Sequence, residues 1–165
     1  MIYFEDTKSV EGINVVSLLA HEIFREHFTP LIGVRQVEYM LQKFQRPDTL
    51  FCQMQEGYSY TLVYQGKEAI GYFSLLPYPD AMFLSKFYLR REFRGQGIGR
   101  LMMEEIFRRS KDKQMVYLHV NKQNTGSIAA YEKMGFSIVG SPVTEIGGGF
   151  VMDDYRMERP VSSDQ

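Results

Sequence analysis

Three glycines alternate with larger residues in the stretch RGQGIG, which runs from Arg94 to Gly99. A strand-like apolar stretch precedes it and a helix-like stretch follows it. The N-terminus of a helix presents backbone N–H groups that have no partner within the helix, and the helix dipole adds partial positive charge there. Glycines leave these amide groups uncovered and allow the positive φ that turns successive N–H groups inward. The stretch therefore predicts a binding site for an anion such as a phosphate or pyrophosphate.

Two common nucleotide-binding motifs do not fit this stretch. The dinucleotide-binding fingerprint has a glycine at its sixth position, where this chain has Arg100, and a P-loop continues with Lys and Ser or Thr, where it has Arg100 and Leu101. A strand-to-helix turn whose glycines serve only packing remains an alternative interpretation. Arg91, Arg94 and Arg100 add positive charge nearby, which favours the anion site.

The elements that would position this stretch follow from hydrophobic periodicity and turn residues. Helical spacing predicts helices at 10–27, with Ser9 as N-cap, and at 34–44, a short helical segment after Pro47, a helix from Ile98 and another at 124–134. Aromatic and β-branched residues predict strands at 1–4, 58–64, 68–77, 81–89, 115–120, 136–140 and 149–158. The strand–helix–strand order of the second half implies a parallel pairing, whereas the three consecutive strands imply antiparallel ones. The chain is therefore predicted to form an α/β fold with a mixed sheet.

Composition limits the class of protein and its surroundings. The 165 residues suffice for one domain, and the formal net charge of -1 argues against a nucleic-acid partner. The single cysteine, Cys52, excludes an internal disulfide and favours a reducing compartment. The N-terminal stretch lacks the apolar core of a signal peptide, and no stretch approaches the roughly 18 apolar residues of a membrane span. We therefore expect a cytoplasmic protein with a domain at 1–159 and a flexible tail at 160–165.

A second motif follows the glycine stretch by about 25 residues. The glycine stretch fits the pattern Arg/Gln-x-x-Gly-x-Gly/Ala through Arg94, Gly97 and Gly99. The stretch VNKQNTGSIAAYEKMGF fits Asn-x-x-Ala/Ser-x-x-x-Tyr-x-x-x-Gly-Phe through Asn124, Ser127, Tyr131, Gly135 and Phe136. Either pattern alone is weak, but both in this order and spacing resemble the GCN5-related N-acetyltransferase (GNAT) superfamily. With their strands, the two motifs cover about 81–140.

The resemblance implies a single-domain GNAT fold, in which a mixed, mostly antiparallel sheet is splayed between its fourth and fifth strands and carries helices on both faces. It implies acetyl-CoA as cosubstrate, no metal, and direct attack by a primary amine of a small molecule, a polyamine or a peptide. We expect neither nucleic-acid nor membrane partners, and a homodimer is one arrangement common in such folds. The alternative function is a regulatory or interaction module that binds CoA without turnover.

The resemblance also implies roles for individual residues. Those assigned to acetyl-CoA are Tyr88, Leu89, Arg94, Gly95, Gln96, Gly97, Ile98, Gly99, Asn124 and Tyr131. Tyr131 is the expected general acid for the leaving thiolate, and the backbone N–H of Leu89 is expected to polarise the thioester carbonyl. Each assignment has a structural alternative, since Asn124 can be simply a helix N-cap and Tyr131 simply a core aromatic residue.

The general base and the acceptor site are less sharply indicated. The fourth strand offers Ser85 and Lys86 but no carboxylate, which leaves a chain of water molecules or His119 on the fifth strand to accept the proton of the amine. The expected acceptor residues are Glu26, Phe28, Glu38 and Tyr39, and a solvated helix with aromatic core residues is the alternative. The adjacent acids Asp153 and Asp154 lie either on the acceptor side or at a protected sheet edge.

Overall fold

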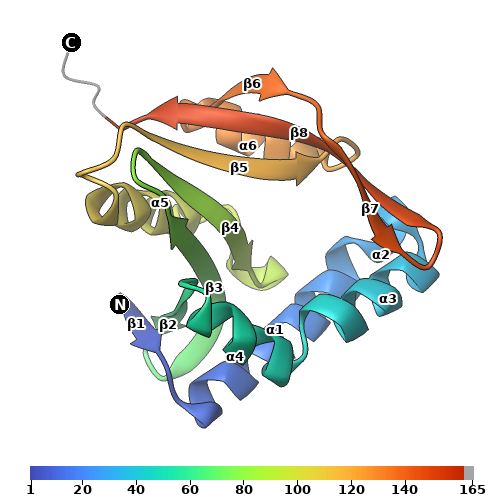
Figure 1. Ribbon diagram of the computed structural model, residues 1–165. Coiled ribbons are helices and arrows are strands. Elements are labelled where there is room, and N and C mark those ends of the chain that lie inside the picture. Colours follow the sequence, from blue (N-terminus) through green and yellow to red (C-terminus); the bar gives the residue numbers. More distant parts are fainter. Residues whose placement is uncertain (162–165) are drawn as a thin grey trace. The chain divides into compact units, whose positions relative to one another are not determined.

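The computed structural model describes residues 1–161 (Figure 1). These residues form two compact units, one made of 1–76 with 86–102 and the other of 77–85 with the chain from 103 onward. The first unit contains β1 (Ile2–Thr7), α1 (Val10–His27), α2 (Thr29–Ile32), α3 (Val34–Phe44), α4 (Pro47–Gln55), β2 (Ser59–Gln65), β3 (Glu68–Pro77) and a 3₁₀ turn, η1 (Arg91–Phe93). The second contains β5 (Met115–Asn121), α6 (Thr125–Lys133), β6 (Ser137–Gly140), β7 (Val143–Gly147) and β8 (Phe150–Pro160). Strand β4 (Ala81–Leu89) and helix α5 (Ile98–Arg109) run from one unit into the other.

Antiparallel strands and the helices α1 to α4 form most of the first unit. Strand β2 pairs with β1 on one side and with β3 on the other, and β4 follows β3 in the sheet. Helix α1 begins as predicted, because the hydroxyl oxygen of Ser9 accepts a hydrogen bond from the backbone N–H of Gly12 at 3.0 Å. The segment between α1 and α3, expected to be a turn, contains the single helical turn α2, which ends at Gly33 with a φ of +88°.

The core of the first unit lies between α1, α4 and strands β2 and β3. Helix α1 contributes Ile13, Val16 and Ile23, which recur at helical spacing and are almost fully buried. They pack with Leu50 of α4 and with apolar residues of β2 and β3, and Figure 1 shows α1, α3 and α4 lying together. Full burial of each such side chain stabilises the folded unit by about 1.5–3 kcal/mol.

Strand β8 is the central strand of the second unit. Residues Ala81–Leu84 of β4 run parallel to Met115–Leu118 of β5, and β5 is antiparallel to β8. Strand β4 continues to Leu89 and β5 to Asn121 beyond that ladder of four residue pairs. Strands β6 and β7 both pair with β8 in antiparallel fashion.

The end of the chain differs from the sequence prediction in two respects. We expected two closing strands, whereas the structure has three, because Val143–Gly147 pairs with the first residues of the long β8 and a Gly-rich turn joins the two strands. The predicted flexible tail at 160–165 also begins too early. Pro160 pairs with Met115 in β5, and the backbone N–H of Val161 donates to the carbonyl oxygen of Gln114 at 2.9 Å. The remainder of that prediction, 162–165, lies outside the described residues.

None of the helices within residues 1–161 combines the length and the hydropathy needed to cross a membrane.

Lys86 is a buried lysine in the first unit, with 8% of its surface exposed. Its ammonium nitrogen Nζ lies 2.6 Å from the hydroxyl oxygen of Tyr60 and 3.3 Å from the side-chain oxygens of both Gln45 and Gln53. The Tyr60 hydroxyl in turn donates to Gln53. All three acceptors are neutral, so they satisfy the three N–H donors of the ammonium group without neutralising its charge. Burial accordingly lowers the pKa of Lys86 to about 7.

This lysine makes the stability of the protein depend on pH. Between about pH 7 and the ordinary lysine pKa of about 10.4, the unfolded chain binds more protons at Lys86 than the folded chain. The free energy of unfolding should therefore rise with pH from about 7 upward, and the destabilisation is fully present below that pH. We expect Lys86→Met to flatten this rise in urea unfolding measured from pH 6 to 9.5. The variant Lys67→Met, at an exposed lysine of the β2–β3 turn, is the control. Equal slopes for all three proteins would contradict the prediction.

Candidate functional site

The glycine stretch forms the loop that leads into α5. Gly95 has a φ of +77° and Gly97 a φ of +86°, which confirms the positive φ that the sequence suggested for this loop. The backbone N–H of Leu101 donates to the carbonyl oxygen of Gly97 at 3.2 Å. The amide groups of Ile98, Gly99 and Arg100 therefore precede the repeating hydrogen bonds of the helix, in the position where an external acceptor is required.

Open space surrounds all three glycines of the loop. A Cβ atom added at Gly95, Gly97 or Gly99 would meet no atom of residues 1–161 within 4 Å. Gly71 shows the contrast, because a Cβ there would lie 2.4 Å from the carbonyl oxygen of Tyr88. Gly99 lies outside the positive-φ region, so neither backbone conformation nor packing accounts for a glycine at that position. This geometry does not support the packing alternative, and it fits a loop that keeps its surface clear for an anion.

Arginines before the loop are held by side chains of α1 and by the backbone. Arg90 contacts Glu22 of α1 at 2.8 Å and also the carboxylates of Glu68 and Glu92. Arg94 donates through Nε to the carbonyl oxygen of Leu89 at 2.9 Å. Its Nη1 atom lies 3.4 Å from Nδ1 of His27 of α1. Burial lowers the pKa of Arg94 from its usual high value.

Tyr88, one of the residues assigned to acetyl-CoA, belongs to an aromatic cluster at the end of β4. Its ring centroid lies 5.3 Å from that of Phe24, 5.5 Å from that of Tyr72 and 6.2 Å from that of Phe28. Phe28, an expected acceptor residue, is thus beside a predicted donor residue. The close approach of Gly71 to the backbone of Tyr88 holds β3 against this end of β4.

The other expected acceptor residues differ in how closely other side chains of the protein already bind them. Glu38 of α3 accepts two hydrogen bonds from Arg25, both at 2.9 Å, and these hold the pKa of its carboxyl group below the usual value. Tyr39 lies close to Lys43, whose Nζ is 3.4 Å from its hydroxyl oxygen. Glu26 is 3.7 Å from Arg91, beyond hydrogen-bond distance, and its buried Oε1 has no hydrogen-bond partner among residues 1–161.

Asn124 and Tyr131 lie on α6 in the second unit. Asn124 is the N-cap, with a side-chain oxygen that accepts from the backbone N–H of Ser127 at 3.4 Å, and only 7% of its surface is exposed. The capping role is therefore confirmed, and contact with a ligand remains a prediction. Tyr131 is half-buried, and its ring centroid is 5.8 Å from that of Phe136.

His119 lies on β5 directly opposite Arg156 of β8. Its ring is 5.6 Å from that of Phe83 between centroids. His119 is exposed, and partial desolvation of its ring together with the Arg156 charge lowers its pKa. The imidazole ring of His119 is therefore mostly neutral near pH 7 and can accept a proton.

The two adjacent acids of β8 occupy different environments. Asp153 forms an ion pair with Lys122 at 3.0 Å, whereas Asp154 is buried, with 6% of its surface exposed. Burial and the neighbouring Asp153 raise the pKa of Asp154 to about 6. The sequence shows two adjacent acids, but only the structure identifies Asp154, which lies opposite Asn121 of β5, as the buried one.

The sequence assigned no role to His27 or Arg90, and it named Lys86 without indicating that this residue is buried. The charged stretch HEIFREH of α1 and the arginines of RREFR are visible in the sequence, but their pairing depends on the fold.

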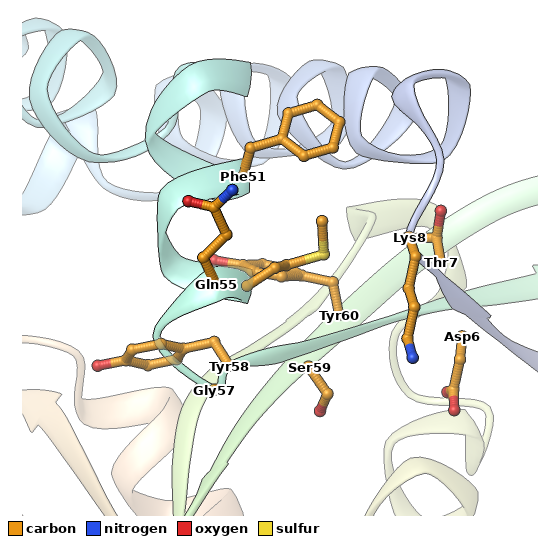
Figure 2. Close-up of a pocket in the computed structure, with 10 residues that line it drawn as sticks. Asp6, Thr7, Lys8, Phe51, Gln55, Gly57, Tyr58, Ser59 and Tyr60 are labelled. Atoms are coloured by element: carbon orange, nitrogen blue, oxygen red, sulfur yellow. The ribbon is translucent and has the colours of Figure 1, made fainter.

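A hollow of about 430 Å³ also lies in the first unit (Figure 2). It is bordered by α4, which carries Phe51 and Gln55, by Lys8 after β1, and by Tyr58 and Tyr60. It contains none of the predicted site residues, so its walls offer no support for the acetyl-transfer site.

Known proteins resemble this chain in both sequence and fold. The model of the Acetyltransferase (GNAT) family matches residues 20–136. Peptidyl-lysine N-acetyltransferase YjaB of Salmonella typhimurium is 33% identical over 82 residues, which cover 48% of this chain and 51% of that protein. The chain thus spans about half the length of this curated relative.

Solved structures extend the similarity to almost the whole chain. PaiA N-acetyltransferase from Thermoplasma acidophilum, in complex with coenzyme A, has a TM-score of 0.77 at 20% identity. The match covers 97% of this chain and 99% of the PaiA chain. A chimera of the Vibrio cholerae spermidine N-acetyltransferase SpeG and hSSAT has a TM-score of 0.71 at 18% identity, and the match covers 97% of this chain and 95% of the chimera. At these identities the structures confirm the predicted fold alone. Because the family model spans more than half of the sequence, this chain belongs to the GNAT acetyltransferase family.

Proposed function

We propose that this chain transfers the acetyl group of acetyl-CoA to a primary amine. The observation that carries the proposal is the uncovered loop before α5, whose three glycines leave room and amide donors for an anion. The diphosphate of acetyl-CoA is an anion suited to such a loop. Family membership and the coenzyme A complex of the PaiA structure support this assignment.

The residues assigned to acetyl-CoA divide between backbone and side-chain roles. Amide groups of Gly95, Gly97 and Gly99 and their neighbours Gln96 and Ile98 receive the diphosphate, and Arg94 lies directly before them. Backbone groups of Tyr88 and Leu89 then bond the pantetheine arm as an added strand would. The side chain of Asn124 contacts the same arm while it caps α6.

Direct attack requires two proton transfers. The acceptor nitrogen forms a bond to the acetyl carbon, the carbon–sulfur bond breaks, and the N–H of Leu89 stabilises the developing oxyanion. Tyr131 donates its proton to the departing sulfur, because a phenol with a pKa of about 10 remains protonated where a thiol with a pKa of about 8.5 is forming. The proton released by the amine passes to His119, whose lowered pKa keeps the ring neutral, or to a chain of water molecules.

The acceptor is a primary alkylamine, as in a lysine side chain or a polyamine. The relatives support this class, since YjaB is named for peptidyl-lysine and the SpeG chimera for spermidine. Such an amine is cationic near neutral pH. Glu26 is better suited than Glu38 to attract it, because Arg25 already holds both oxygens of Glu38 while one oxygen of Glu26 lacks a hydrogen bond. Phe28 and Tyr39 provide apolar contact for its carbon chain.

The activity itself is tested by release of CoA thiol in the presence of acetyl-CoA and a panel of amines. We expect release with a lysine-containing peptide or a polyamine, and none with a matched secondary or tertiary amine. CoA binding without thiol release for any amine would instead favour a regulatory module. The absence of a carboxylate that could act as general base in 81–89 favours the same alternative.

Replacement of Tyr131 by Phe tests the general acid. Loss of the hydroxyl proton should lower kcat by about 10²- to 10⁴-fold, the usual contribution of general acid catalysis. The dissociation constant of acetyl-CoA, measured by calorimetry, should change far less. Tyr155→Phe, at another half-buried tyrosine of the second unit, is the matched control. Equal losses of kcat and of affinity for acetyl-CoA would indicate that Tyr131 only packs.

Gly99 tests the uncovered loop. A Cβ added at this position meets no other part of the described residues within 4 Å and needs no unusual φ, so Gly99→Leu should keep the melting temperature of the wild type. Its side chain would occupy the space of the diphosphate and should weaken acetyl-CoA binding by about tenfold or more, equivalent to about 1.4 kcal/mol. Gly99→Ala, which the motif admits, should have a smaller effect. Unchanged affinity in the leucine variant would argue against a diphosphate at this loop.

A further inference from the structure

Helix α1 faces the segment before the glycine loop with three side chains. Glu22 lies 2.8 Å from Arg90, Glu26 lies 3.7 Å from Arg91, and His27 lies 3.4 Å from Arg94. Residues four apart on a helix lie on the same side of it, so α1 presents Glu22 and Glu26 together, and His27 follows as its last residue. The segment 90–94 thus lies along the end of α1.

Arg94 differs from the other two arginines in its partners. Arg90 and Arg91 contact carboxylates, whereas Arg94 donates to the carbonyl oxygen of Leu89 at 2.9 Å and lies beside an imidazole. Its guanidinium group therefore joins the end of β4 to the end of α1, one residue before Gly95.

The glycines that follow gain little restraint from their surroundings. Glycine has the largest conformational freedom of any residue, and no side chain within 1–161 would even touch a Cβ at Gly95, Gly97 or Gly99. The shape of the loop consequently depends on where it is anchored. On its N-terminal side the part-buried anchor is Arg94, beside an exposed hydrogen bond from Gln96 Nε2 to the carbonyl oxygen of Glu92 at 3.1 Å, and on its C-terminal side it is the buried Ile98 at the start of α5.

We propose that Arg94 and His27 are positioning residues, which hold the glycine loop in its anion-binding shape through the hydrogen bond from Arg94 to the Leu89 carbonyl. The inference rests on the proposed function and adds that α1 controls affinity for acetyl-CoA without touching it. Arg94 then matters chiefly as an N–H donor directed at the backbone. In the competing interpretation, Arg94 matters as a positive charge that attracts the diphosphate.

Two substitutions at Arg94 separate these interpretations. Glutamine retains an N–H donor without the charge, and methionine retains neither. Calorimetric titration with CoA should show Arg94→Gln within about threefold of the wild-type affinity, and Arg94→Met weaker by about tenfold or more, the size expected for a lost charge-assisted hydrogen bond. Equal losses in the two variants would overturn the positioning role and leave charge as the explanation.

The contribution of α1 is tested by a double-mutant cycle. His27→Leu should weaken CoA binding in wild-type protein but have little further effect on Arg94→Met, since both changes release the same anchor. His27→Gln, which keeps a neutral hydrogen-bonding group, should restore most of the affinity. Arg25→Gln on the same helix, where Arg25 forms an ion pair with Glu38 of α3, is the matched control and should bind CoA normally. Additive effects of His27→Leu and Arg94→Met would overturn the role of α1.

Kinetics and melting temperatures complete the test. A positioning role predicts that KM for acetyl-CoA rises in Arg94→Met and His27→Leu while kcat at saturation changes by less than about threefold, with melting temperatures close to wild type. Parallel losses of kcat and affinity would overturn it. Absence of CoA binding in the wild-type protein would overturn the proposed function together with this inference, whereas normal wild-type binding with equal affinities in all variants would overturn this inference alone.

Discussion

Amide groups at the start of a helix need acceptors that the helix itself cannot supply, and the first unit is arranged around this requirement. The glycines before α5 keep the amides uncovered, Gly71 lets β3 approach the end of β4, and the arginines of 90–94 are held by α1. Removing side chains from the loop provides room for an anion but also removes the contacts that would fix its shape. The surrounding side chains must therefore supply the order that the loop lacks.

Charge in this part of the molecule is largely compensated within the protein. Glu22 and Glu38 are bound by arginines, so an acidic residue on α1 or α3 does not by itself provide attraction for a cationic substrate. Glu26 stands apart because its contact with Arg91 is longer than a hydrogen bond. Under the proposed function, selection of a cationic amine would depend on a few incompletely paired groups rather than on the total number of acids in the sequence.

Local patterns in the sequence predicted the two motifs, the caps at Ser9 and Asn124 and most strands, because each depends on residues close together in the chain. Strand β7 escaped prediction since Ile146 is its only buried residue, which leaves almost no hydrophobic signal. The contacts of Lys86 and the approach of His27 to Arg94 join residues 26 to 67 positions apart, so only the register of the fold reveals them. The burial of Asp154 also depends on distant residues, because Asp154 lies between Asn121 of β5 and the carbonyl oxygen of Pro142 before β7.

The long strand β8 has a consequence for how the second unit is assembled. All the antiparallel ladders described for this unit, with β5, β6 and β7, include β8. During synthesis, β5 and α6 leave the ribosome before the strand that must join them, and some thirty residues separate β5 from β8. Pairings between distant segments form slowly, so the nascent unit passes through a stage in which the open edge of β5 is exposed to other chains. The first unit must close a longer gap, because some fifty residues separate β1 from its partner β2, and its completion also depends on the later arrival of β4.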